Sequence, residues 1–258
     1  MQTNQLSTSP SGEEFPLPTH EEYQAEFARL KALAARQRKA GKEIVVVVGL
    51  GFVGAVMAAV VADSTDKKGR STKFVIGVQR PSTRSFWKIR LLNRGVSPVK
   101  AEDPEVEQLI ARCVNKKQTL VATYTEEALK LADVVVVDVQ CDYLKESLGN
   151  VRTGSAEMAA LEASIATIAE NIPPAALVLI ETTVAPGTTE QVAYPIMKKI
   201  FRKRGIRSEP LLAHSYERVM PGKHYVASIR DFWRVCSGVN ATSRKLVTQF
   251  LNEVLHTD

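Results

Sequence analysis

Runs of consecutive apolar residues alternate with stretches of helical periodicity along most of this chain. Residues 44–48 read Ile-Val-Val-Val-Val, and residues 133–139 contain a second run of valines. Uninterrupted β-branched runs are typical of strands that are buried on both faces, as in a parallel sheet. Similar patterns predict further strands over residues 73–79, 118–123, 177–183, 211–215 and 231–238.

Helices are predicted between these strands, where apolar residues recur at helical spacing. The segments are 55–62, 82–93, 104–114, 125–131, 156–171, the stretch after Thr188, and 241–255. Strands that alternate with helices form a parallel sheet with right-handed crossover connections. We therefore predict an α/β fold: a Rossmann-like doubly wound, mostly parallel sheet with an N-terminal helical extension.

Residues 1–40 form the predicted extension, and residues 41–258 form the predicted domain. Residues 1–18 are rich in Ser, Thr, Gln, Pro and Gly, so we expect them to be disordered or loosely held. Thr19 and Glu22 have the spacing of a capping box, which predicts a helix that ends near Lys39. One face of this helix carries Tyr23, Phe27, Leu30, Leu33 and Ala34. Packing on its own domain is the favoured interpretation, and docking of a partner chain is the alternative.

Composition and charge exclude several classes of protein. The chain has 258 residues, of which 45% are hydrophobic and 24% charged, as in an ordinary globular protein. The formal charge is +6, but the basic residues are interspersed with 28 acidic ones and aromatic content is only 6%, so we predict no nucleic-acid partner. The polar N-terminus and the lack of a membrane-length apolar run predict no membrane partner and a cytoplasmic location. The cysteines (Cys113, Cys141 and Cys236) lack metal-site spacing, and their odd number argues against a disulfide framework.

A glycine-rich turn follows the first predicted strand directly. Gly49, Gly51 and Gly54 have the spacing G-x-G-x-x-G with Phe52 and Val53 between them, and the predicted helix of small residues at 55–62 follows. In a dinucleotide-binding fold these glycines permit the turn, the approach of the pyrophosphate and close helix packing. The helix N-terminus then offers N–H groups to the phosphates. Because the motif lies between a strand and a helix, it predicts dinucleotide binding far more strongly than the spacing alone.

The end of the second predicted strand departs from the usual dinucleotide pattern. An acid normally accepts a hydrogen bond there from the ribose 2′-hydroxyl, whereas this chain has Gln79 followed by Arg80. Gln79 can still bind a hydroxyl, and Arg80 favours a 2′-phosphate. We predict a preference for NAD over NADP that is weaker than an acid would give. The alternative is that both side chains only face solvent.

Polar residues follow three other predicted strands, where ligands of open α/β sheets bind. They are Gln140 and Cys141, Thr183, and Glu217 with Arg218. Nothing adjacent in sequence is suited to ionise Cys141, so a packing role is favoured over a nucleophilic one. The polar loop at residues 143–154 is a candidate lid.

Four segments together resemble the nucleotide-sugar 6-dehydrogenases, the UDP-glucose/GDP-mannose dehydrogenase family. They read Val-Gly-Leu-Gly-Phe-Val-Gly (48–54), Glu-Thr-Thr-Val-Ala-Pro-Gly-Thr (181–188), Ser-Tyr-Glu-Arg-Val-Met-Pro-Gly-Lys (215–223) and Phe-Trp-Arg-Val-Cys-Ser-Gly (232–238). The resemblance spans roughly residues 44–238. The third segment is more similar to family members that act on UDP-N-acetylhexosamines than to those that act on UDP-glucose.

The resemblance implies a function and roles for residues. The family oxidises C6 of a nucleotide sugar to a carboxylate in two NAD-dependent hydride transfers, through a thioester on a cysteine. It implies NAD as cofactor, a UDP-sugar substrate, a place in polysaccharide biosynthesis and a homo-oligomeric full-length enzyme. Thr183 matches the threonine that positions the hydrolytic water beside the cofactor, and Glu217 matches the base for thioester hydrolysis. Glu217 and Arg218 are the expected substrate contacts.

The chain also departs from the family pattern. Tyr216 replaces a usual proline, Gln79 a usual acid, and Cys141 a threonine that is common in the cofactor site. The central helix and the C-terminal sugar-binding domain, with its nucleophilic cysteine, are absent from residues 1–258. We therefore expect this chain to be the cofactor-binding part of such an enzyme, inactive alone. The alternative is a non-catalytic dinucleotide-binding module that docks a partner. A small-molecule NADP reductase is disfavoured, because no Tyr-x-x-x-Lys pair is placed for hydride chemistry.

Overall fold

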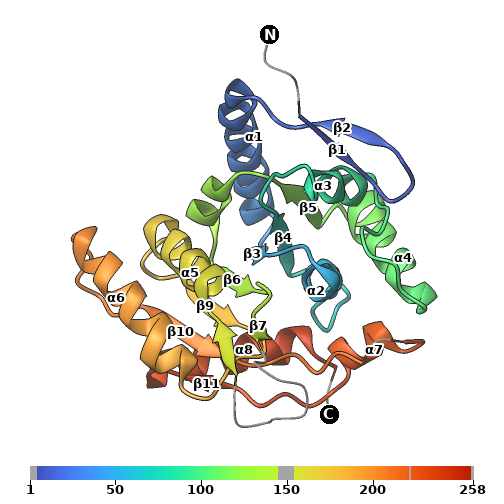
Figure 1. The fold of residues 1–258 in the computed structure, drawn as a ribbon. Helices are drawn as coiled ribbons and strands as arrows, with labels where there is room; N and C mark the ends of the chain where they lie inside the picture. Colours follow the sequence, from blue (N-terminus) through green and yellow to red (C-terminus); the bar gives the residue numbers. More distant parts are fainter. Residues whose placement is uncertain (1–4, 145–153, 221, 257–258) are drawn as a thin grey trace.

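A seven-stranded sheet forms the centre of the molecule in the computed structural model, which describes residues 5–144, 154–220 and 222–256 (Figure 1). Its strand order is β11-β10-β9-β6-β3-β4-β5. All neighbouring strands are parallel except β10 and β11. The bounds are β3 Glu43–Val48, β4 Lys73–Val78, β5 Leu120–Thr123, β6 Val134–Val137, β9 Leu177–Ile180, β10 Leu211–His214 and β11 Ser237–Gly238. The prediction of a Rossmann-like, mostly parallel sheet is confirmed.

Helices cover both faces of this sheet. They are α1 His20–Lys39, α2 Phe52–Asp63, α3 Phe86–Asn93, α4 Pro104–Ala111, α5 Ala159–Asn171, α6 Tyr194–Lys203, α7 Tyr225–Arg230 and α8 Ala241–Val254. Shorter helical segments are η1 Arg112–Lys116, η2 Glu126–Leu131 and η3 Thr189–Ala193. The helices predicted over 104–114 and 125–131 therefore differ in type: the first ends in a π turn, and the second is a 3₁₀ helix.

The alternation of side chains along β3 divides the core into two apolar layers. Val45 and Val47 pack in the layer that contains α2, α3, α4, α7 and α8. Ile44 and Val46 pack on the opposite face, in the layer that contains α1, α5 and α6. Successive strand residues point to opposite faces, so a strand between two layers must be apolar throughout. This explains why the valine runs show no alternation of apolar and polar residues.

The order of the strands locates the ligand-binding edge. Strand β3 lies between β4 and β6, so the chain leaves β3 toward one side of the sheet and later returns to its other side. Ligands of doubly wound sheets bind at this reversal, beyond the carboxyl ends of the strands. The glycine turn at residues 49–54 follows β3 and therefore lies at this point.

The N-terminal segment differs from the prediction. The disordered start expected over residues 1–18 is wrong for the described part, because β1 Leu6–Thr8 and β2 Glu14–Pro16 pair in antiparallel register. Phe15 is buried in the core, and the Ser7 hydroxyl accepts a hydrogen bond from the Trp87 backbone N–H on α3. The buried Phe15 ring and the tertiary contacts of Ser7 and Glu13 outweigh the polar composition of the segment.

Helix α1 packs on its own domain. The Thr19 backbone N–H donates to the Glu22 carboxylate at 2.6 Å, which is the expected capping contact. Leu30 and Ala34 are buried against the sheet, so the favoured interpretation of the apolar face is confirmed.

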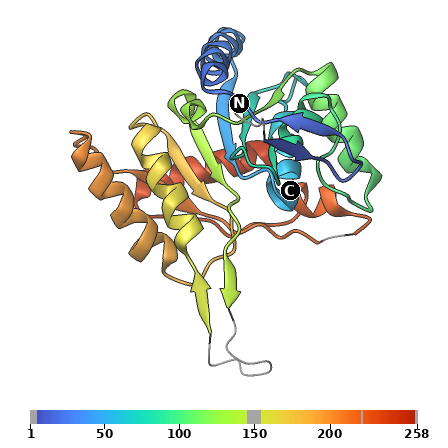
Figure 2. The same ribbon diagram turned by 45° about the horizontal axis from the view of Figure 1, so that its top comes forward.

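Two other segments differ from the predictions. The strand expected over 231–238 is limited to β11, because residues 231–236 are irregular. Residues 225–230, just before them, form the unpredicted helix α7. The lid expected over 143–154 lies mostly outside the described residues. Its flanks form the antiparallel strands β7 Asp142–Leu144 and β8 Ser155–Glu157, which project from the body of the domain (Figure 2).

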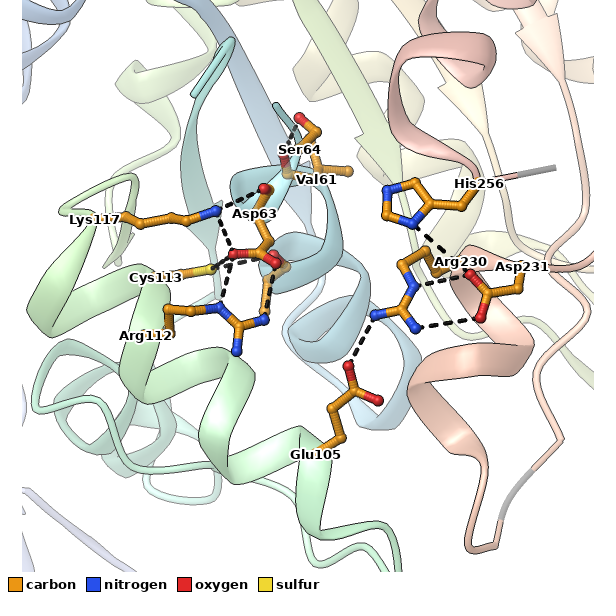
Figure 3. Close-up of polar contacts among 11 residues, drawn as sticks. Val61, Asp63, Ser64, Glu105, Arg112, Cys113, Lys117, Arg230, Asp231 and His256 are labelled. Atoms are coloured by element: carbon orange, nitrogen blue, oxygen red, sulfur yellow. Dashed lines mark hydrogen bonds and ion pairs between the residues drawn. The ribbon is translucent and has the colours of Figure 1, made fainter. Parts of the chain in front are cut away.

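Charged contacts connect the helices of one layer (Figure 3). Asp63, the last residue of α2, binds Arg112 at 2.8 Å and Lys117 at 2.7 Å, and these residues lie at and just beyond the η1 turn. Arg230, at the end of α7, binds Glu105 on α4 at 2.8 Å. These pairs connect the end of α2 with the η1 region and α7 with α4. In the described ranges, no helix is long and apolar enough to cross a membrane.

Candidate functional site

The glycine turn packs closely against the end of β6. Gly49 has φ +99°, and a Cβ atom there would lie 2.5 Å from the Asp138 carbonyl oxygen. A Cβ atom at Gly54 would lie 1.9 Å from the Gly49 carbonyl oxygen. Both positions therefore exclude any larger residue for reasons internal to the fold.

Gly51 has the opposite surroundings. A Cβ atom built there meets no protein atom within 4 Å. Gly51 lines two cavities, which also share Asp138, Val139 and Gln140. Its lack of a side chain therefore keeps space open for a ligand rather than for the protein itself.

The first cavity, which we call the α5 cavity, has a volume of about 560 Å³. Gly49, Gln79, Arg80, Lys88 and Glu126 line it together with the face of α5 that carries Ala160, Ala163, Ser164, Thr167 and Ile168. It lies over the carboxyl ends of β3 and β4, where the adenosine half of a dinucleotide binds in this fold. The structure thus brings Gln79 and Arg80 to one cavity with the glycine turn.

Gln79 supports the glycine turn directly. Its side-chain carbonyl oxygen Oε1 accepts a hydrogen bond of 2.9 Å from the Leu50 backbone N–H. Its own backbone N–H donates to the Thr123 carbonyl at 3.0 Å. Gln79 is therefore a structural partner of the turn as well as a lining residue.

The second cavity, which we call the Thr183 cavity, has a volume of about 410 Å³. Besides the shared residues it is lined by Phe52, Val53, Cys141, Thr182, Thr183 and Glu217. These residues come from α2 and from the carboxyl ends of β6, β9 and β10. Three strand ends that are far apart in the sequence thus meet beside Gly51.

Backbone contacts hold the polar groups of this cavity. The Glu217 backbone N–H donates to the Glu181 carbonyl at 3.2 Å, and the Glu217 carboxylate accepts from the Val219 N–H at 2.5 Å. Thr182 donates its hydroxyl to the Val139 carbonyl at 2.8 Å, whereas Thr183 is exposed. The Thr183 hydroxyl forms no hydrogen bond with a described residue, so it can reach a water molecule or a ligand.

Arg218 is not brought into either cavity. Its side chain is exposed, and its guanidinium lies 5.9 Å from the centre of the Phe232 ring. The predicted substrate role of Arg218 therefore stays a prediction.

A buried charge cluster lies beneath the Thr183 cavity. Glu181 and Arg234 have exposed side-chain fractions of 0% and 1%, and their charged groups are 2.8 Å apart. Asp138 lies nearby, and its Oδ2 atom is buried without a hydrogen-bond partner among the described residues. Burial, and next the charge of Glu181, raise the pKa of Asp138 well above that of an ordinary carboxyl. Burial also raises the pKa of Glu181, although Arg234 opposes it.

Neither Cys141 nor Cys113 has an activated thiol. Burial, and then the charges of Asp142 and Glu157, raise the pKa of Cys141. Its Sγ atom lies 3.5 Å from the Glu157 carbonyl oxygen and 3.4 Å from the Met158 sulfur. Burial raises the pKa of Cys113 to about 12. Cys236 contacts the Thr248 hydroxyl at 3.7 Å. No group of three or more potential metal ligands occurs in the described ranges.

Several residues of the site were missed from the sequence. Asp138 and Glu181 occupy strand ends, a position that in itself suggests a polar role. Tyr225 was missed because helix α7 was not predicted after the turn that precedes it. The Tyr225 ring stacks on the Phe52 ring with centroids 4.7 Å apart, and the Tyr225 hydroxyl donates to the Phe52 carbonyl. Lys88, on α3, lines the α5 cavity and was also not predicted.

The residues present fit a dinucleotide. A Cβ atom at Gly51 would meet no protein atom within 4 Å, Gly51 is the N-cap of α2, and both cavities are lined by Gly51. An extended ligand with a central pyrophosphate matches this arrangement.

Comparisons with known proteins agree with this geometry. Residues 43–255 match the model of the UDP-glucose/GDP-mannose dehydrogenase family, NAD binding domain. UDP-N-acetyl-D-mannosamine dehydrogenase of Pyrococcus horikoshii is 27% identical over 203 residues, which are 78% of this chain and 42% of that protein. The enzyme of the same name from Methanococcus maripaludis is 25% identical, over 79% of this chain and 40% of its own length.

A solved structure is similar to this chain in both sequence and fold. NDP-N-acetyl-D-galactosaminuronic acid dehydrogenase from Methanosarcina mazei is 30% identical, with a TM-score of 0.72. The match covers 88% of this chain and 44% of that one. The chain thus spans less than half the length of the relatives it matches.

Proposed function

Since the chain belongs to the UDP-glucose/GDP-mannose dehydrogenase family, whose NAD-binding domain it contains, we propose that it is the cofactor-binding part of an enzyme that oxidises C6 of a UDP-sugar to the uronate. NAD is the cofactor of this domain. A UDP-N-acetylhexosamine is the favoured substrate, because the curated relatives are named UDP-N-acetyl-D-mannosamine dehydrogenases. We expect a role in polysaccharide biosynthesis and a homo-oligomeric full-length enzyme.

One observation supports this proposal above the others: Thr183 and Glu217 line the same cavity as Gly51 and Cys141. A dinucleotide with its pyrophosphate at Gly51 would extend one end into this cavity. A hydroxyl and a carboxylate then lie beside the reacting end of the cofactor. Such a pair suits the hydrolysis of an acyl intermediate, which needs a water molecule that is both oriented and deprotonated.

The residues of this chain have separate roles in the proposed reaction. The bound NAD supplies a hydride acceptor. The glycine turn and the N-terminus of α2 hold its phosphates. Thr183 orients the hydrolytic water, and Glu217, held by the Val219 N–H, accepts its proton. The water oxygen attacks the thioester carbonyl, the carbon–sulfur bond breaks, and the thiolate leaves. Burial raises the pKa of the Cys113 and Cys141 thiols, and Cys236 lines neither cavity. We therefore expect the nucleophilic thiol to come from outside residues 1–258.

The alternative, a non-catalytic module that docks a partner through α1, loses support because the apolar face of α1 packs on its own domain. Its remaining form is a dinucleotide-binding module without a catalytic role. The two proposals differ in what the chain does when the other parts of a family enzyme are supplied.

The test measures NADH absorbance with UDP-N-acetylglucosamine, UDP-N-acetylmannosamine and UDP-glucose. Residues 1–258 should bind NADH yet show no steady turnover. With the missing parts of a family enzyme, fused or added as a separate chain, two NADH should form per sugar oxidised. In that assembly Glu217→Gln should slow release of the uronate by about a hundredfold or more, because general base catalysis contributes about that factor. NADH binding without turnover in every assembly would instead favour the non-catalytic module.

A further inference from the structure

The α5 cavity contains cationic groups that the binding of NAD does not require. From their positions we propose that this cavity recognises a 2′-phosphate on the adenosine ribose, through Gln79, Arg80 and Lys88, so that NADP binds about as tightly as NAD. The inference rests on the proposed dinucleotide site and adds a specificity to it.

The first step concerns the hydrogen-bonding capacity of Gln79. Its Oε1 atom already accepts from the Leu50 N–H at 2.9 Å, which leaves the amide NH₂ group for a ligand. An NH₂ group is a donor only, so it suits the oxygens of a phosphate. An acid at this position would repel a 2′-phosphate, and the neutral amide removes that repulsion.

The second step concerns two cations that lack partners. The Arg80 guanidinium and the Lys88 ammonium both line the cavity, and neither forms an ion pair or hydrogen bond with any described residue. An arginine that directly follows the usual acid position is a known means of accommodating a 2′-phosphate. Two unpaired cations beside a donor amide are the composition of a phosphate-binding site.

The acidic lining residues do not remove this positive character. Asp138 lies at the junction with the Thr183 cavity, under the pyrophosphate position rather than near the ribose. Glu126, in the first turn of η2, is therefore the acid able to compete. Glu126 is one carboxylate in a cavity with two cations, Arg80 and Lys88. The variant Glu126→Gln shows whether this carboxylate favours NAD over NADP.

The experiment measures dissociation constants of NADH and NADPH for residues 1–258 by calorimetry, at one low ionic strength. The wild-type constants should agree within about tenfold. Gln79→Asp should raise the ratio of the NADPH to the NADH dissociation constant by at least about tenfold, whatever it does to NADH affinity through the bond to Leu50. Arg80→Ala and Lys88→Ala should each weaken NADPH by about five- to tenfold and NADH by less than about twofold. The matched control is Arg84→Ala, an exposed arginine of the same loop that lines neither cavity.

Several results would overturn the proposal. One is a wild-type preference for NADH of more than about tenfold. A second is a loss of NADH affinity in Arg80→Ala equal to its loss of NADPH affinity, because a phosphate-specific contact cannot affect both. A third is a large gain of NADPH affinity in Glu126→Gln, which would identify Glu126 as an acid that rejects the phosphate. If neither nucleotide binds, the dinucleotide site itself is wrong and the specificity fails with it. NADH binding without NADPH binding would refute the specificity alone.

Discussion

The α5 cavity and the Thr183 cavity meet at Gly51, but their charged groups are held in different ways. In the α5 cavity, Arg80 is exposed and Lys88 is half-buried, and neither side chain has an ion-pair or hydrogen-bond partner in the described part of the chain. Under the Thr183 cavity, Glu181 and Arg234 are almost completely buried and paired at 2.8 Å. One end of a bound dinucleotide would therefore contact the side chains of Arg80 and Lys88. The other end would lie over the buried pair of Glu181 and Arg234.

Because of this difference, substitutions in the α5 cavity should affect cofactor specificity, and substitutions beneath the Thr183 cavity should affect the stability of the fold. A charge that faces solvent can be exchanged at little cost to the fold, so the α5 cavity is where cofactor preference can change. A buried ion pair cannot lose one member without leaving an unpaired buried charge. The chemistry of the Thr183 cavity is therefore tied to the packing of the domain.

The largest effect is expected at the buried pair. Arg234→Met should lower the free energy of unfolding by about 3–5 kcal/mol, because Glu181 would remain buried without its partner. Denaturant unfolding measures the change. The double variant Glu181→Leu with Arg234→Met should recover most of the loss. Arg70→Met, which removes a pair whose arginine is 73% exposed, should change stability by less than about 1 kcal/mol. Equal losses in Arg234→Met and Arg70→Met would refute the contrast.

The second prediction compares two glycines of one turn. Gly51→Val should weaken NADH binding by about a hundredfold, about 2.7 kcal/mol, because its side chain would fill the space left for the pyrophosphate. Its stability should stay within about 1 kcal/mol of wild type, since no protein atom lies within 4 Å of the added Cβ.

Gly54→Ala is the matched variant. Its Cβ would lie 1.9 Å from the Gly49 carbonyl oxygen, so the turn and α2 must separate. We expect a loss of about 1–3 kcal/mol in stability together with weaker binding. Calorimetry and denaturant unfolding on both variants distinguish the two roles. Unchanged NADH affinity in Gly51→Val would show that the pyrophosphate does not bind beside Gly51.

The sequence allowed the sheet and its ligand-binding edge to be predicted, because both depend on local pattern. Valine runs identify strands buried on two faces, and their alternation with helices leaves few possible topologies. The prediction failed where tertiary contacts decide the structure. Phe15 and Ser7 order a segment of polar composition. Helix α7 was hidden by the turn before it and depends on contacts such as the one from Tyr225 to Phe52.

The site was predicted unevenly for a related reason. The residues at strand ends, Gln79, Thr183 and Glu217, were found because a parallel sheet brings all its carboxyl ends to one edge. The pairing of Glu181 with Arg234 joins residues 53 positions apart, and no local pattern indicates it. The bond from Leu50 to Gln79 likewise depends on the observed geometry of the turn.

A smaller effect is expected from pH at Asp138. Burial raises the pKa of Asp138, so the native state keeps a proton that the unfolded chain loses above its ordinary pKa of about 3.9. The unfolded state then binds fewer protons, and stability falls as the pH rises from there toward the folded pKa. Asp138→Asn removes this group. Its advantage in melting temperature over wild type should therefore be larger at about pH 8 than at about pH 4. An advantage that shrinks as the pH rises would show that Asp138 is ionised and paired in the native state.

The smallest effect is expected at Cys141, the one cysteine that lines a cavity of the site. Burial and the nearby Asp142 and Glu157 raise the pKa of its thiol, whereas a nucleophile needs that pKa lowered. Cys141 should therefore react with iodoacetamide more slowly than a free thiol at neutral pH. Cys141→Ser should change NADH affinity by less than about twofold, because the hydroxyl occupies nearly the same space. The controls are Cys113→Ser and Cys236→Ser, which leave Cys141 as the reporter in the alkylation assay. Steady NADH production from a UDP-sugar by residues 1–258 alone, abolished in Cys141→Ser, would contradict this argument. It would make Cys141 the nucleophile and the Thr183 cavity a complete active site.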